Sequence, residues 1–213
     1  MANTASPFGF RQFGQREGTA PTAGIERLLI TSSDTNLYFT GDAVALSSYS
    51  LVAGTISPVS SLVTVGLVAP VGVFLGGEYY NANVGRTVWN SYWPGNQGSS
   101  AFYNAYVCTN TQQLYIAQAT SGAVMGTSCI GFNVSGSVTG SSLGNQTTGQ
   151  SVQTLLSTTV TGLSSTGGWR IVDTYANYAP PGVNGTSTGS EGLQIMVVQP
   201  NSFSRNVLTG TST

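Results

Sequence analysis

The stretch VGVFLGGEYYNANVGRTVW, residues 71–89, decides the fold class of this chain. Alternate residues of an extended chain face opposite sides, so Val73 and Leu75 share one side of this segment. The glycines at positions 76 and 77 predict a bulge or a sharp bend, and residues 81–85 predict a turn. The pattern therefore predicts a bent hairpin at the centre of an all-β domain.

Short apolar segments separated by turn residues continue this pattern along the chain. We expect further strands at residues 26–31, 43–48, 62–67, 151–163, 168–175 and 192–198, a hairpin at residues 105–109 and 113–118, and a strand or strand pair within residues 125–134. The segments predicted to be loops are residues 51–61, 90–104, 136–149 and 177–191. Strands of this number and length are typical of a single antiparallel β-barrel or β-sandwich domain. We place that domain at residues 25–200.

The two ends of the chain differ from the predicted domain. Residues 1–24 are predicted to form an extended N-terminal arm, and residues 201–213 a flexible C-terminal tail. The arm contains PFGFRQF at residues 7–13, where a glycine interrupts three Phe residues and neither helical nor strand periodicity is kept. Burying one Phe side chain contributes about 1.5–3 kcal/mol, so the arm is expected to lie on its own domain or on a neighbouring subunit. The side chains expected to bind a partner are Phe8, Phe10, Arg11 and Phe13.

Charge is sparse throughout the chain. Only 6% of the 213 residues are charged, against about 25% in ordinary domains. All six cations are arginine, there is no lysine or histidine, and the net charge is −1. This composition predicts no nucleic-acid partner and no anionic membrane surface, and no apolar run reaches the length of about 18 residues that spans a bilayer. A surface kept soluble by hydroxyl and amide groups is instead typical of a protein that other protein covers, which favours a homo-oligomer or a larger assembly.

The residue types that enzymes use most are missing. Without histidine and lysine there is no Ser-His-Asp triad, no phosphate-binding lysine and no Schiff base, so we predict a protein that is not an enzyme and has no cofactor or metal. The remaining possibility is a catalytic pair of carboxylates like that of a glycosidase, for which there are three candidates. Asp42 lies in a Gly-Asp turn and is expected to accept backbone hydrogen bonds, Glu78 is expected to pair with Arg86, and Asp173 is given no function.

Two cysteines and one group of aromatic residues leave alternatives open. Cys108 and Cys129 are interpreted as two buried free thiols, with a single disulfide as the alternative. A row of exposed aromatic rings would form a platform for sugar, whereas the same rings are also typical of core and loop packing. The residues concerned are Tyr79, Tyr80, Trp89, Tyr92 and Trp93, and Trp93 is also predicted to bind a partner.

The order of several short motifs resembles one known family. The motifs are PFGFR at residues 7–11, LYFTGDAV at 37–44, VGVFLGGEYY at 71–80, AYVCT at 105–109, LYIAQ at 114–118, GFN at 131–133, WRIV at 169–172 and LQIMVV at 193–198. In this order and spacing they resemble small structural proteins of tailed-bacteriophage heads, some of which are capsid cement, or decoration, proteins. Each motif alone is unspecific, and the resemblance extends over most of the chain.

The resemblance implies a function and a partner. It implies a virion protein that is assembled in the host cytoplasm, binds the outer surface of the capsid and stabilises it. The partner would be the major capsid protein, with the chain present as a dimer or trimer on the shell. The alternative is a carbohydrate-binding virion or adhesin module that uses Trp89, Tyr92 and Trp93.

Overall fold

The computed structural model describes residues 7–16, 24–30, 36–46, 56–58, 70–95, 103–120, 125–138, 144–160, 167–175 and 195–201. All pairings between the named strands in these ranges are antiparallel. The helices in the described ranges are two three-residue 3-10 turns, η2 (Thr127–Cys129) and η3 (Ser157–Thr159). The prediction of an all-β, antiparallel fold is confirmed.

The first large sheet has five strands in the order β1-β10-β17-β16-β11. Their bounds are β1 Arg11–Gln15, β10 Gln113–Gln118, β17 Ile195–Pro200, β16 Trp169–Thr174 and β11 Asn133–Val134. The strand predicted at 168–175 is present as β16; the one predicted at 192–198 overlaps β17, and its residues 192–194 lie outside the described residues. β1 lies within the residues predicted as an arm, so Arg11–Gln15 of that segment form an edge strand in the described part of the sheet.

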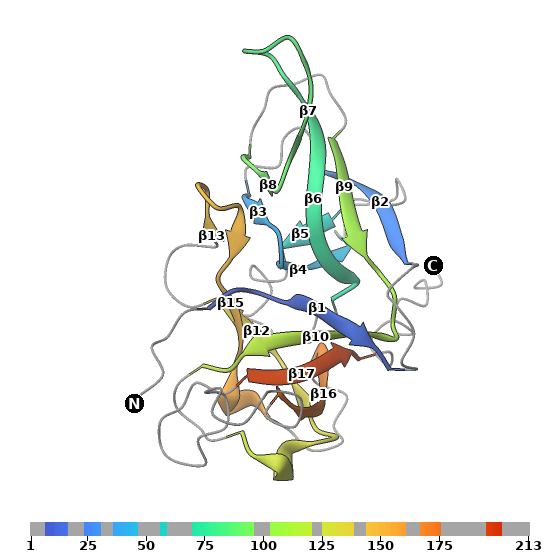
Figure 1. The fold of residues 1–213 in the computed structure, drawn as a ribbon, viewed down its shortest axis with the longest axis vertical. Helices are drawn as coiled ribbons and strands as arrows, with labels where there is room; N and C mark the ends of the chain where they lie inside the picture. Colours follow the sequence, from blue (N-terminus) through green and yellow to red (C-terminus); the bar gives the residue numbers. More distant parts are fainter. Residues whose placement is uncertain are drawn as a thin grey trace, which may run out of the picture.

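The second large sheet has six strands in the order β2-β9-β6-β4-β5, with β7 also paired to β6. Their bounds are β2 Ile25–Ile30, β9 Tyr103–Cys108, β6 Gly72–Asn81, β4 Ala43–Leu46, β5 Ile56–Pro58 and β7 Arg86–Asn90. In Figure 1 these strands stand above the five-stranded sheet, whose strands run across beneath them. The β6–β7 hairpin rises from the top of the molecule, away from the five-stranded sheet.

Three two-stranded ribbons complete the described fold. They are β3 (Tyr38–Phe39) with β8 (Tyr92–Trp93), β12 (Gly136–Val138) with β15 (Gln153–Leu155), and β13 (Gly144–Asn145) with β14 (Gln150–Ser151). The predicted loops at 51–61, 90–104 and 136–149 also contain short strands, namely β5 in the first, β8 in the second, and β12 and β13 in the third.

The central hairpin has the predicted bend. The register of β6 against β9 shifts between Phe74 and Gly76, and Gly76 has a φ of 139°. Residues with a side chain rarely adopt such a φ, so glycine is needed at this bulge. Residues 82–85 form the turn that leads into β7.

Other sequence predictions need correction. Residues 105–109 and 113–118 do not form a hairpin, because β9 pairs with β2 and β6 whereas β10 pairs with β1 and β17. The segment 125–134 contains η2 and only the short strand β11, and the strand predicted at 151–163 ends at Leu155 before η3. The segments 62–67, 177–191 and 202–213 lie outside the described residues.

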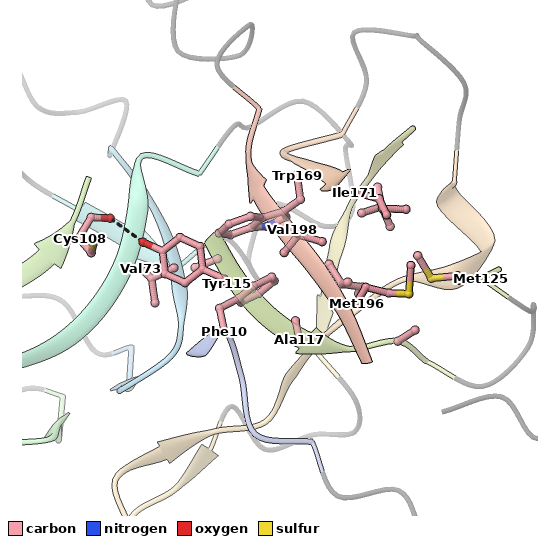
Figure 2. Packing of buried hydrophobic residues seen from close by; sticks show 14 of the residues in the cluster. Phe10, Val73, Cys108, Tyr115, Ala117, Met125, Trp169, Ile171, Met196 and Val198 are labelled. Carbon is pink, nitrogen blue, oxygen red and sulfur yellow. Dashed lines mark hydrogen bonds between the residues drawn. The ribbon is translucent and has the colours of Figure 1, made fainter. Parts of the chain in front are cut away.

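Two apolar clusters hold the sheets together. The first lies between the two large sheets and combines Ala43, Val73 and Cys108 of the six-stranded sheet with Tyr115 and Trp169 of the other. In Figure 2 the Tyr115 ring points toward the Cys108 carbonyl, to which its hydroxyl donates a hydrogen bond of 3.4 Å. The second cluster covers the opposite face of the six-stranded sheet and includes Leu28, Tyr38, Val44, Phe74, Tyr79, Trp93 and Val107.

Candidate functional site

Phe10 belongs to the core of its own domain. Its side chain is 2% exposed, and its ring stacks on Trp169 with 4.2 Å between ring centroids. Its backbone N–H donates to the Gly41 carbonyl at 2.9 Å, immediately before β1 begins. Of the two places expected for the arm, its own domain or a neighbouring subunit, the structure has the Phe10 ring on its own domain, where it is buried rather than available at the surface.

The neighbouring side chains of the same segment remain accessible. The Arg11 guanidinium lies 5.0 Å from the centroid of the Phe8 ring and donates to Gln150 Oε1 at 3.3 Å. The Phe13 side chain is 37% exposed and meets the Tyr175 ring edge-on, at 5.7 Å. We call Phe8, Arg11 and Phe13 the β1 rim. It places two aromatic rings and one cation along an edge of the five-stranded sheet.

Trp93 is the second predicted binding residue that the structure moves inside. Its side chain is 3% exposed, and its ring meets Tyr79 at 5.5 Å in an edge-to-face contact. β8 pairs with β3, which brings Tyr92 onto the Phe39 ring at 5.8 Å. The structure thus has Trp93 in core packing, the alternative to an exposed binding ring, because the β3–β8 ribbon turns this side chain into the second apolar cluster.

The turn formed by Thr40, Gly41 and Asp42 joins four parts of the fold. The Thr40 N–H donates to the carbonyls of Ser91 and Gly149, each at 3.0 Å, and the Gly41 N–H donates to the Phe74 carbonyl at 2.9 Å. The Gly41 carbonyl in turn accepts the Phe10 N–H described above. This turn thus fixes β6, β8 and the β13–β14 ribbon relative to the segment that leads into β1.

Asp42 stabilises that turn from inside. Its Oδ2 accepts a hydrogen bond of 2.8 Å from the Phe39 N–H, as the Gly-Asp pattern predicts. Burial raises the pKa of the Asp42 carboxyl to about 7, although hydrogen bonding to Ser151 and to the Phe39 amide opposes the shift. The side chain is only 1% exposed, so it makes its hydrogen bonds inside the fold.

The other two carboxylates belong to different sheets, Glu78 to β6 and Asp173 to β16. Glu78 lies opposite Trp89 and Arg86 lies opposite Asn81, so the predicted Glu78–Arg86 pair has the wrong register and faces opposite sides of the hairpin. Asp173 accepts a hydrogen bond of 2.7 Å from the N–H of Thr174. In the described ranges there is no group of three acidic, cysteine or histidine residues that could hold a metal ion.

The exposed aromatic residues form a site that the sequence did not define. Trp89 is 56% exposed, and its indole lies 5.1 Å from the Tyr106 ring on the neighbouring part of the sheet. Strand register puts Glu78, Trp89, Tyr106 and Arg27 on one face, which we call the Trp89 face. Tyr106 and Arg27 were missed because their proximity depends on the pairing of β2, β9 and β6, which local sequence does not specify.

Both thiols are free. The interpretation of both cysteines as free thiols is confirmed. Both were also expected to be buried, and Cys108 is buried whereas Cys129 is half-buried. No helix within the described ranges has the length and apolar character needed to cross a bilayer.

The fold and these sites define an all-β, antiparallel protein with two exposed surfaces, the β1 rim and the Trp89 face. Comparisons with protein-family models, with curated proteins and with solved structures found no match. The functional conclusions therefore depend on the chemistry of these surfaces and on the order of the sequence motifs.

Proposed function

We propose that this protein is a structural component of a tailed-bacteriophage virion that binds the outside of the capsid shell and stabilises it. The order of motifs from PFGFR to LQIMVV supports the proposal, and so does a composition with 6% charged residues. Contacts made by such a surface are mainly apolar and hydrogen-bonded, so salt screens them little. Because many copies would bind the same shell, weak individual contacts would give a high overall avidity.

The observation that carries the proposal is the exposed β1 rim. β1 is an edge strand in the described part of the five-stranded sheet; Arg11 and Phe13 lie on it, and Phe8 lies in the segment that leads into it. Phe10 anchors this segment to the core, so the rim is held in place before a partner arrives. An anchored surface loses less conformational entropy on binding than a free arm does. We propose that the major capsid protein, or a second copy of this chain, contacts this rim.

The test is binding of the purified protein to heads of the encoding phage that lack it. We expect saturable co-sedimentation with the heads and a higher temperature of DNA release. The variant Phe8→Ser, Arg11→Ser, Phe13→Ser should lose affinity by about tenfold or more, because it removes the exposed Phe13 ring, the half-buried Phe8 ring and the cation. Deleting residues 1–16 is a poor substitute, because it would also remove β1 and Phe10.

The control is Phe132→Ser. Phe132 is 36% exposed, close to the value for Phe13, and directly precedes β11 at the opposite edge of the same sheet. This variant should bind heads as the unmodified protein does. A folded triple variant that keeps full affinity contradicts the role of the rim, and failure of the unmodified protein to bind heads contradicts the capsid function itself.

A further inference from the structure

The Trp89 face is a continuation of the surface that packs between the two sheets. Val73 and Cys108 lie directly opposite each other and are buried in the first apolar cluster. Tyr106, two residues before Cys108 on β9, lies on the same face. Further along the β6–β7 hairpin, this face also carries Glu78 and Trp89. In Figure 1 this hairpin extends beyond the five-stranded sheet. On this part of the sheet Trp89 and Tyr80 are 56% and 46% exposed, and Tyr106 is half-buried.

The backbone holds the Trp89 indole against the sheet. A Cβ added at Gly76 would lie only 2.6 Å from Trp89 Cζ2, so the indole rests directly on the glycine backbone. One side of the ring is thus packed on Gly76 and beside Tyr106, whereas 56% of the side chain remains exposed. This support orients the ring without hiding it, as a stacking surface requires.

Polar groups lie on the same face as the Trp89 ring. Desolvation, together with a side-chain hydrogen bond to Glu78, raises the pKa of the Tyr106 hydroxyl, while the positive charge of Arg27 on β2 lowers it. Strand register independently places Arg27 directly opposite Tyr106 and Glu78 diagonally across from it, two residues along the β6–β9 pairing. The face combines an exposed ring with a carboxylate acceptor, a hydroxyl and a cationic donor.

A further aromatic residue extends the face along the hairpin. Tyr80 lies two residues beyond Glu78 on β6, on the same face, and is 46% exposed. Two residues of a strand advance about 7 Å, so Tyr80 and the pair of Trp89 and Tyr106 offer rings at successive places along β6. A ligand that uses both must be longer than one sugar ring.

We propose that the Trp89 face binds a neutral oligosaccharide along the β6–β7 hairpin. The apolar C–H face of a pyranose stacks on the exposed indole, and its hydroxyl groups exchange hydrogen bonds with Glu78, Tyr106 and Arg27. A ligand without charge fits this face, because the negative charge of Glu78 and the positive charge of Arg27 leave the face with no net charge. This site is separate from the β1 rim, so it does not depend on the capsid proposal.

Trp89 itself reports on the test. The chain has three tryptophans, and Trp93 and Trp169 are 3% and 0% exposed, so acrylamide quenches mainly Trp89 in the folded protein. The probes are cellotetraose, chitotetraose and maltotetraose, added at millimolar concentrations to the full chain. We expect at least one of them to protect the emission from acrylamide in a saturable way. Absence of protection by all three overturns the proposal.

Variants separate stacking from folding. Trp89→Ala should abolish binding, measured by calorimetry with the probe that protects, and Tyr80→Ala should weaken it by about tenfold. Glu78→Gln removes a charged acceptor and should weaken it similarly, without changing the size of the side chain. Val84→Ser is the control, because Val84 is an exposed apolar residue in the hairpin turn outside the face. Unchanged affinity in folded Tyr80→Ala and Glu78→Gln overturns the assignment, even if Trp89→Ala fails to fold.

Discussion

The Phe10 ring stacks almost parallel on the Trp169 indole, with 4.2 Å between centroids and 13° between planes. Phe10 directly precedes the edge strand β1, and Trp169 begins β16, three places along in the same sheet. The Trp169 ring also meets Tyr115 of β10 edge-on at 5.6 Å. Figure 2 shows these three rings together. The contact ties the N-terminal segment to the first apolar cluster, which all three rings share.

Phe10→Ala is therefore expected to destabilise the whole domain. Removing a buried Phe side chain costs about 3–5 kcal/mol, since apolar contacts are lost and a cavity remains. Urea unfolding followed by tryptophan fluorescence measures the change, because Trp169 lies in the affected cluster. Phe13→Ala is the comparison in the same segment. Its half-exposed ring should cost about 1 kcal/mol or less, and equal losses in the two variants would contradict the distinction.

The sequence predicted much of the sheet content but little of its connectivity. The hairpin at 71–89 was predictable because a period of two, paired glycines and an Asn-rich turn act locally. The partners of β9 and β10 were not, since pairing between distant strands depends on which apolar faces meet. Phe10 shows the same limit, because a Phe in a Gly-broken segment gives no sign of whether it covers its own core or a neighbour.

Stability should depend on pH through Asp42. The unfolded carboxyl has a pKa near 3.8, whereas burial raises the folded value to about 7. Between these values the folded chain binds a proton that the unfolded chain does not, so the free energy of unfolding falls as pH rises from about 4 to 7 and then levels off. One pKa unit corresponds to about 1.4 kcal/mol, so the fall amounts to a few kcal/mol.

Thermal unfolding at several pH values from acid to neutral measures this effect. Asp42→Asn should make the pH profile flatter, because the residue can no longer ionise, and Asp173→Asn should keep the slope as a partly buried control. An Asp42→Asn variant with the slope of the unmodified protein would show that another group is responsible.

The candidate sites show for which residues the sequence alone predicts the local environment of the side chain. Asp42 was correctly predicted to accept a backbone hydrogen bond, because the Gly-Asp turn determines this locally. The five aromatic residues of the hairpin and its following loop were not separable, since Tyr79 and Tyr80 differ only in which side of β6 they face. The β3–β8 pairing then turns Trp93 inward, and the hairpin register leaves Trp89 outside.

The two thiols should differ in reactivity. Cys108 is 1% exposed between the sheets, whereas Cys129 is half-buried at the end of η2. A thiol reagent such as dithionitrobenzoate needs access to sulfur, so the native protein should react at Cys129 and only the unfolded protein at both sites. Cys129→Ser should remove the native reaction, and rapid native labelling of this variant would contradict the burial of Cys108.

Substitutions at Gly76 and Gly85 can distinguish backbone strain in the hairpin from the packing of the Trp89 ring. Both have positive φ, 139° and 70°, so an alanine at either position costs backbone energy of about 1–3 kcal/mol. At Gly85 a Cβ would meet nothing within 4 Å, whereas at Gly76 it would also collide with the Trp89 indole. Gly76→Ala should therefore displace Trp89 and increase its quenching by acrylamide, and Gly85→Ala should leave that quenching unchanged. Equal quenching in the two variants would mean that the indole does not rest on Gly76.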